Sequence, residues 1–314
     1  MPIGLSPNEP LFAYCRGAIK GVLAIVIQTK GPSYRSVGAT MVFTDDGARV
    51  GSLSSGCIEA DLKLHADRVR NNKLPANVQY GAGSPFKDIV LPCGGALEIL
   101  LIPQPEPAEL ALINMAVLTR QTINVNVSLQ SGKITKSNSL DQSIGCNLFS
   151  LTIEPALQFI VFGKGPEATM FAQLAETLGY PGTLLSPDPE TLAALEGASW
   201  ATKPITRPHC PDDLSMDERT AILLFFHDHE WEAPILKYVL SSNAFYIGCQ
   251  GSRKTSEVRL AQLKLMGLSQ TELNRLRGPI GLIPSTRDPA TLGVSVLAEV
   301  LGLANEPSKG GEPS

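Results

Sequence analysis

Phe159-Ile-Val-Phe-Gly163-Lys-Gly165-Pro-Glu-Ala168 is the stretch that decides the fold of this 314-residue chain. An apolar run ends in Gly-x-Gly-x-x-Ala, and a helical pattern follows directly. Gly163 permits a tight turn, Gly165 lets a phosphate approach backbone N–H groups at a helix N-terminus, and Ala168 permits close helix packing. The same small residues also fit a turn that merely packs a helix on a sheet. Either way, the pattern predicts a strand, a turn and a helix.

Strand and helix patterns alternate on the C-terminal side of this turn. Strand patterns fall at residues 183–185, 221–226 and 244–247, and helical patterns at 169–178, 233–240 and from 254 onward. Such alternation predicts a parallel sheet covered by helices. Asp288-Pro289 provides an N-cap and a first-turn proline for a last helix, which we expect Gly302 to end.

The N-terminal half has mixed patterns that predict an α+β domain. We expect helices at 11–19, ending near Gly21, and at 58–71, capped by Ser54 or Ser55; strands at 22–27, 89–91 and 96–102; and hairpins at 39–52, around Asp45-Asp46-Gly47, and at 123–133.

The chain length and patterns predict two domains. We expect an α+β domain over residues 1–155, a Rossmann-like α/β domain with a parallel sheet over 156–304, and a disordered tail over 305–314. The boundary falls near Glu154-Pro155, where the pattern changes.

Composition excludes several classes of protein. The chain has 26 Lys+Arg and 30 Asp+Glu, a net charge of −4, and no block of five like charges, which argues against binding to nucleic acid or an anionic membrane. The apolar run at 22–27 is shorter than a signal-peptide core, and no run approaches a membrane span. We therefore expect a cytoplasmic protein. None of its six cysteines forms a Cys-x-x-Cys pair, which favours free thiols.

Polar loops follow three of the expected parallel strands. Because parallel strands point their carboxyl ends to the same edge, we expect one crevice lined by the Gly163 turn and by His227, Asp228, His229, Gly251, Ser252 and Arg253. The loop of His227, Asp228 and His229 fits crevice lining or helix capping better than a dedicated metal site, because adjacent residues of an extended loop point in different directions. Asp188, after the next strand, is the candidate for a ribose contact.

Two thiols of the first half lie in glycine turns. Ser55, Gly56 and Cys57 precede a helix, whose N-terminus favours a thiolate. Cys93 is followed by Gly94 and Gly95, which can expose backbone N–H groups. Thiolates are soft ligands suited to metals or sulfur transfer, although such cysteines are also common as buried small apolar residues.

A cation stands in a third turn of the first half. Arg35 closes Gly31-Pro-Ser-Tyr-Arg35 and can pair with an anionic ligand or with a surface carboxylate. We expect Arg35, Cys57 and Cys93 to line one pocket.

These residues together resemble the XdhC/CoxI family, accessory proteins of molybdenum hydroxylases such as xanthine dehydrogenase and aldehyde oxidoreductases. The matching segments are Thr29-Lys-Gly-Pro-Ser-Tyr-Arg35 with Gly38-Ala39, Gly51-Ser-Leu-Ser-Ser-Gly-Cys57-Ile-Glu59, Leu91-Pro-Cys-Gly-Gly95, Phe162-Gly-Lys-Gly165, Tyr246-Ile-Gly-Cys-Gln-Gly-Ser-Arg-Lys254 and Gly278-Pro-Ile-Gly-Leu282. They occur in the family's order and span most of the chain.

The resemblance implies a chaperone that binds the molybdenum cofactor, molybdopterin or its cytosine dinucleotide form. It further implies that the chain guards the cofactor during sulfuration with a cysteine desulfurase and passes it to the large subunit of an apo-molybdoenzyme. Cys57 and Cys93 become candidate molybdenum contacts. We also expect a homodimer.

The chain departs from the family pattern at the glycine turn and near the C-terminus. Lys164 and Pro166 replace Ala and His, and Leu282-Ile-Pro284 lacks the family's carboxylate. Since Pro166 removes a donor N–H and no catalytic acid is evident, we expect weak NAD(P) binding without hydride transfer. The alternatives are an NAD(P)-dependent oxidoreductase, which lacks an evident proton donor, and an interaction scaffold without a ligand.

Overall fold

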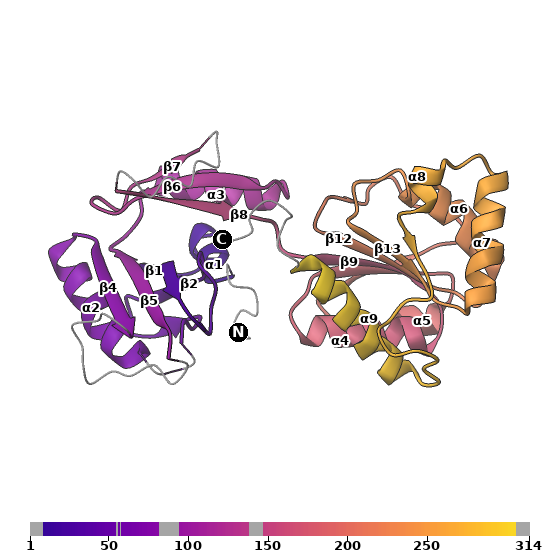
Figure 1. Ribbon diagram of the computed structural model, residues 1–314, viewed down its shortest axis with the longest axis horizontal. Coiled ribbons are helices and arrows are strands. Elements are labelled where there is room, and N and C mark those ends of the chain that lie inside the picture. Colours follow the sequence, from indigo (N-terminus) through magenta and orange to yellow (C-terminus); the bar gives the residue numbers. More distant parts are fainter. Residues whose placement is uncertain (1–8, 55, 57, 82–93, 138–146, 306–314) are drawn as a thin grey trace. The chain divides into compact units, whose positions relative to one another are not determined.

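The computed structural model describes residues 9–54, 56, 58–81, 94–137 and 147–305, and the chain divides into two compact units between Pro155 and Ala156 (Figure 1). Unit 1 contains two sheets and unit 2 one, and each unit has its own apolar cores. No helix within these ranges is long and apolar enough to cross a membrane.

Unit 1 is built on a five-stranded antiparallel sheet of order β3-β2-β1-β5-β4. Its strands are β1 (Gly21–Lys30), β2 (Thr40–Thr44), β3 (Arg49–Val50), β4 (Ala76–Gly81) and β5 (Ala96–Ile102). Residues 21–27 of β1 are all buried, as expected for the central strand of a sheet covered on both faces.

Helices and a second sheet cover the two faces of this sheet. Helix α2 (Glu59–Asn72) packs Leu62, Ala66 and Val69 on one face. The other face is covered by α1 (Glu9–Cys15), α3 (Pro107–Leu118) and a three-stranded sheet of β7 (Ile134–Lys136), β6 (Ile123–Ser128) and β8 (Leu148–Ile153).

Several boundaries in unit 1 differ from the sequence predictions. Helix α1 ends at Cys15, because the chain turns at Gly17, which has a φ of 72°. The predicted serine cap of α2 is wrong, since Ile58 is the N-cap residue and Ser54 Oγ accepts from its N–H at 3.1 Å. Helix α3 and strands β4 and β8 were not expected. The strand predicted at 89–91 lies outside the described residues.

Unit 2 is a parallel six-stranded sheet of order β11-β10-β9-β12-β13-β14. The strands are β9 (Gln158–Gly163), β10 (Gly182–Ser186), β11 (Ala201–Pro204), β12 (Thr220–Phe225), β13 (Tyr246–Cys249) and β14 (Leu276–Arg277). In chain order this is 3-2-1-4-5-6, the Rossmann topology. The predicted fold class, an α+β unit followed by a Rossmann-like unit, is therefore confirmed.

Helices cover both faces of the parallel sheet (Figure 1). One face carries α4 (Pro166–Thr177), α5 (Pro189–Ala193) and α9 (Pro289–Ala304), and the other carries α6 (His229–Val239), α7 (Arg253–Leu265) and α8 (Gln270–Leu273). Asp288 caps α9 as predicted, with Oδ1 accepting from Thr291 N at 2.7 Å. Gly302 does not end this helix, which continues to Ala304.

Gly163 is where the end of strand β9 lies close to β12 and α4. A Cβ built on it would lie 2.7 Å from Phe225 O and 3.0 Å from Ala168 Cβ, both inside van der Waals distance. The glycine therefore lets β9, β12 and α4 meet, which is the packing role that the sequence pattern left open.

Gly163→Ala should lower the free energy of unfolding by about 1–3 kcal/mol, because the added methyl group overpacks this junction. Gly302→Ala is the matched control: Gly302 is exposed in α9 and a Cβ there meets no described residue within 4 Å, so the variant should gain up to about 1 kcal/mol from helix propensity. Urea unfolding measures both. A Gly163→Ala protein as stable as the parent would contradict the packing role.

Candidate functional site

Three segments of unit 1 that carry the sequence motifs meet at one end of the five-stranded sheet. The turn after β1 packs against the start of β5, so closely that a Cβ on Gly95 would lie 2.0 Å from Pro32 O. Arg35, in the same turn, donates from Nε to Ser52 O at 3.1 Å, which joins it to the segment that follows β3. The structure thus brings together residues 31–35, 51–54 and 94–95.

A buried carboxylate organises the segment after β3. Glu59, the first residue of α2, is 1% exposed, and its two oxygens accept five hydrogen bonds. The donors are Ser52 Oγ at 2.8 Å, Leu53 N at 3.1 Å, Ser54 N at 2.9 Å, Ser54 Oγ at 2.6 Å and Ile58 N at 3.3 Å. The loop is therefore wrapped around one anion.

These donors also set the protonation state of Glu59. Burial alone would raise the pKa of the carboxyl group, but hydrogen bonds from Ser54, Ser52 and the backbone outweigh it and lower the pKa from 4.5 to about 2. Glu59 is consequently ionised at neutral pH. Its negative charge sits at the helix end that was expected to favour a thiolate, so the dipole of α2 is already compensated there.

Arg35 is held from two sides. Besides the bond to Ser52 O, its guanidinium carbon lies 5.3 Å from the centre of the Tyr34 ring, a cation–π contact. The side chain is half-buried, while Tyr34 is 57% exposed. A cation fixed beside the Glu59 loop is what recognition of an anionic group requires.

The predicted glycines of this region divide into two kinds. Gly56 and Gly94 are exposed and adopt positive φ, and no described residue comes within 4 Å of the position a Cβ would take, which leaves their backbone open to an approaching molecule. Gly95 is buried against Pro32 and serves packing. Ser55, Cys57 and Cys93 lie outside the described residues, so the expected pocket of Arg35 with the two thiols stays a prediction.

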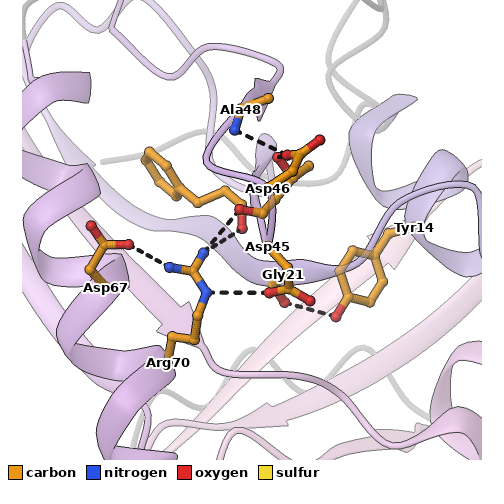
Figure 2. A network of polar contacts seen from close by, with 9 residues as sticks. Tyr14, Gly21, Asp45, Asp46, Ala48, Asp67 and Arg70 are labelled. Carbon is orange, nitrogen blue, oxygen red and sulfur yellow. Dashed lines mark hydrogen bonds and ion pairs between the residues drawn. The ribbon is translucent and has the colours of Figure 1, made fainter.

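The opposite end of the same sheet holds a cavity of about 400 Å³ lined by none of the predicted site residues. Arg70 borders it and is engaged in structural contacts (Figure 2): it pairs with Asp67 and Asp45 and donates to Phe43 O and Thr44 O. Acidic and basic side chains balance there, which gives the cavity no clear ligand preference.

In unit 2 the three predicted loops are neighbours at the carboxyl edge of the sheet. His227 Nε2 lies 3.5 Å from Glu167 Oε1, joining the loops after β12 and β9. Gln250 N donates to Leu224 O at 3.0 Å, which fixes the loop after β13 to β12. Parallel strands produce this arrangement, as expected from the sequence.

Three of the predicted polar ligands of unit 2 are helix caps, which is the capping role that the sequence left open for Asp228. Asp188 Oδ2 accepts from Thr191 N at 3.0 Å, Asp228 Oδ1 from Glu230 N at 3.0 Å, and Ser252 Oγ from Thr255 N at 3.1 Å. The Thr191 hydroxyl also donates to Asp188, and this hydrogen bond is the main reason why the pKa of the Asp188 carboxyl group is lowered. His229 begins α6, and Arg253 is an exposed residue at the start of α7.

The backbone N–H groups of the Gly163 turn are already hydrogen-bonded within the protein. Lys164 N donates to Phe225 O at 3.2 Å, Gly165 N donates to Thr191 Oγ1 at 2.8 Å, and Pro166 has no N–H. Three successive residues therefore offer no backbone N–H to a pyrophosphate, which disfavours the usual dinucleotide mode of this fold.

Two features were missed from the sequence. The sequence marks Glu59 only as part of a motif, and it gives no sign of the buried pair of Glu232 and Arg259 beneath the Gly251 turn. No local signal marks that pair, because its members stand 27 residues apart. Among the side chains that the structure describes, no group of three His, Cys, Asp or Glu could hold a metal ion.

Comparison with known proteins agrees with this architecture. Residues 16–81 match the XdhC and CoxI family, and residues 159–300 match the XdhC Rossmann domain. A relative from Escherichia coli strain K12, the molybdenum cofactor insertion chaperone PaoD, is 30% identical over 89% of this chain and 82% of its own length. The chain belongs to the XdhC and CoxI family. The resemblance noted from the sequence motifs is thereby confirmed.

Two further similar proteins share less of the sequence. A protein from Bacillus subtilis strain 168, described as a probable xanthine dehydrogenase subunit, is 22% identical over 90% of this chain and 92% of its own length. A crystal structure described as a xanthine dehydrogenase from Bacillus halodurans superposes with a TM-score of 0.79 at 22% identity, covering 98% of both chains. The latter shows that the fold is shared.

Glu59→Gln should destabilise unit 1 in a pH-dependent way. The folded-state pKa of Glu59 lies below its unfolded value, so its contribution is complete above about pH 4.5 and disappears as pH falls toward 2. The shift corresponds to on the order of 3 kcal/mol at neutral pH. Urea unfolding at pH 7, 5 and 3.5 should show the difference from the parent shrinking with pH.

Glu257→Gln, at an exposed carboxylate of α7, is the control and should stay within about 0.5 kcal/mol of the parent at each pH. If Glu59→Gln were equally neutral at pH 7, Glu59 would not hold the loop.

Proposed function

We propose that this chain binds the molybdenum cofactor and delivers it to an apo-molybdoenzyme. The observation that carries the proposal is the meeting of the 31–35, 51–54 and 94–95 segments at one end of the unit 1 sheet, with a hydrogen bond from Arg35 to Ser52. The similarity to PaoD, a molybdenum cofactor insertion chaperone, supports the same role.

The residues at this end fit such a cargo. A pterin dithiolene with a phosphate and an oxo-metal centre needs a cation and backbone that can be approached closely. Arg35 supplies the cation, and Gly56 and Gly94, in two of the three motif segments, have exposed backbone. We assign Arg35, Gly56 and Gly94 to cargo binding, with Ser55, Cys57 and Cys93 as further contacts and the two thiols as soft ligands for molybdenum.

We further propose that the bound cofactor is sulfurated with the help of a cysteine desulfurase before transfer. The large subunit of a xanthine dehydrogenase or aldehyde oxidoreductase type of enzyme is the recipient. The chain acts in the cytoplasm, as a homodimer, and without a turnover of its own.

An NAD(P)-dependent oxidoreductase is the alternative that the glycine motif raised. The engaged donors of Lys164 and Gly165 and the absence of an N–H on Pro166 oppose it. Sustained NAD(P)H oxidation by pure, metal-free protein would overturn this preference.

Arg35→Ala should reduce the cofactor content of the protein about tenfold or more, because one charge-assisted hydrogen bond to an anion is lost. Protein is purified anaerobically from a host that makes the cofactor, and molybdenum and pterin are quantified per chain. Arg68→Ala removes an exposed cation from a later turn of α2 and should leave both contents unchanged.

Cys57→Ala should act in the same direction as Arg35→Ala while the free energy of unfolding stays near that of the parent. If the Arg35→Ala protein held as much molybdenum and pterin as the parent, the end of the unit 1 sheet that carries Arg35 would not be the binding site.

A further inference from the structure

A buried ion pair lies beneath the turn that joins β13 to α7. Arg259 of α7 is 2% exposed and Glu232 of α6 is 1% exposed. Arg259 Nε and Nη2 donate to the two carboxylate oxygens at 2.9 Å each, and Nη2 also donates to Gln250 O at 2.8 Å. The guanidinium thus fixes the backbone just before Gly251.

One nitrogen of this guanidinium makes no hydrogen bond to a described residue. Arg259 Nη1 is buried and has no hydrogen-bond partner among the described residues. A Cβ on Gly278 would lie 3.4 Å from Nη1 and from Ser256 Oγ, and a Cβ on Gly251 would lie 3.4 Å from Nη2. Two residues without side chains therefore lie over the guanidinium.

An unpaired buried donor is costly, and folded proteins normally satisfy it with protein, water or a bound group. A bound group could come close to the guanidinium only if Gly251 and Gly278 carried no Cβ, and both are glycines.

The same place is the N-terminus of a thirteen-residue helix. Ser252 caps α7, the first turn of the helix has no acidic residue, and its first two residues, Arg253 and Lys254, are exposed cations. Helix dipole, backbone N–H groups and side-chain charge therefore all favour an anion here.

We propose that the turn at Gly251 and the start of α7 bind a phosphate or diphosphate group, with Arg253 and Lys254 as contacts and the buried Arg259 as the group that fixes and completes the cradle. This turn, and not the Gly163 turn, would bind the phosphate, because the backbone N–H groups of the Gly163 turn are already hydrogen-bonded within the protein. Identifying this anion with the phosphate of the cofactor rests on the proposed function; the anion site itself does not.

The test uses the full chain, free of cofactor, and inorganic pyrophosphate as the probe, followed by calorimetry and by phosphorus NMR. Arg253→Ala/Lys254→Ala should weaken binding about tenfold or more. Lys164→Ala, a cation lost from the Gly163 turn, is the matched control and should change the dissociation constant less than about twofold. Gly278→Ala keeps every charge but fills the space over Arg259, and it should also weaken binding.

Parental affinity in the double variant, or an equal loss in Lys164→Ala, would overturn the site. Parental affinity in Gly278→Ala would overturn the role of Arg259, provided that thermal unfolding shows each variant folded. A parent that carries molybdenum and pterin but binds no pyrophosphate would disprove this inference alone. A parent that binds pyrophosphate and never carries molybdenum would disprove the proposed function alone.

Discussion

The arrangement of the candidate site in unit 1 depends on the charge of Glu59. A carboxylate buried to 1% exposure can remain ionised only because five donors of the preceding loop point at it. Those bonds fix the loop after β3, and Ser52 of that loop accepts from Arg35. Removing the charge would release both the loop and the contact that holds the arginine beside it.

In unit 2 a buried ion of the opposite charge likewise fixes a loop by hydrogen bonds. The guanidinium of Arg259, balanced by Glu232, holds Gln250 O at the turn before α7. In both units a buried ion organises a glycine-containing turn from below, and exposed groups above it remain available for a ligand. Such pre-positioned groups lower the ordering cost of binding an anionic molecule.

Sequence patterns predicted most of unit 2 because its signals are local. The Gly163 turn, the alternation of strands and helices, and the Asp288 cap each lie within a few residues. Helix α3 escaped prediction because it is apolar on nearly all sides, with Glu109 its only charged residue, and so shows no helical period. The sequence predicts Asp188 and Ser252 as ligands although they cap helices, and it leaves ligand and cap both open for Asp228, since the same residue types serve both purposes. Glu59 and Arg259 could not be ranked at all, because their importance comes from burial, which tertiary packing decides.

Cofactor transfer from one protein to another is the measurement that decides whether this chain is a molybdenum cofactor chaperone. Chain loaded anaerobically with molybdenum cofactor is mixed with an apo-molybdoenzyme, the two are separated, and the molybdenum and pterin of each are measured beside the enzyme's activity. We expect both to leave the chain together and to appear in an enzyme that becomes active. Molybdenum and pterin that stay on the chain, with the enzyme still inactive, would contradict the proposed role.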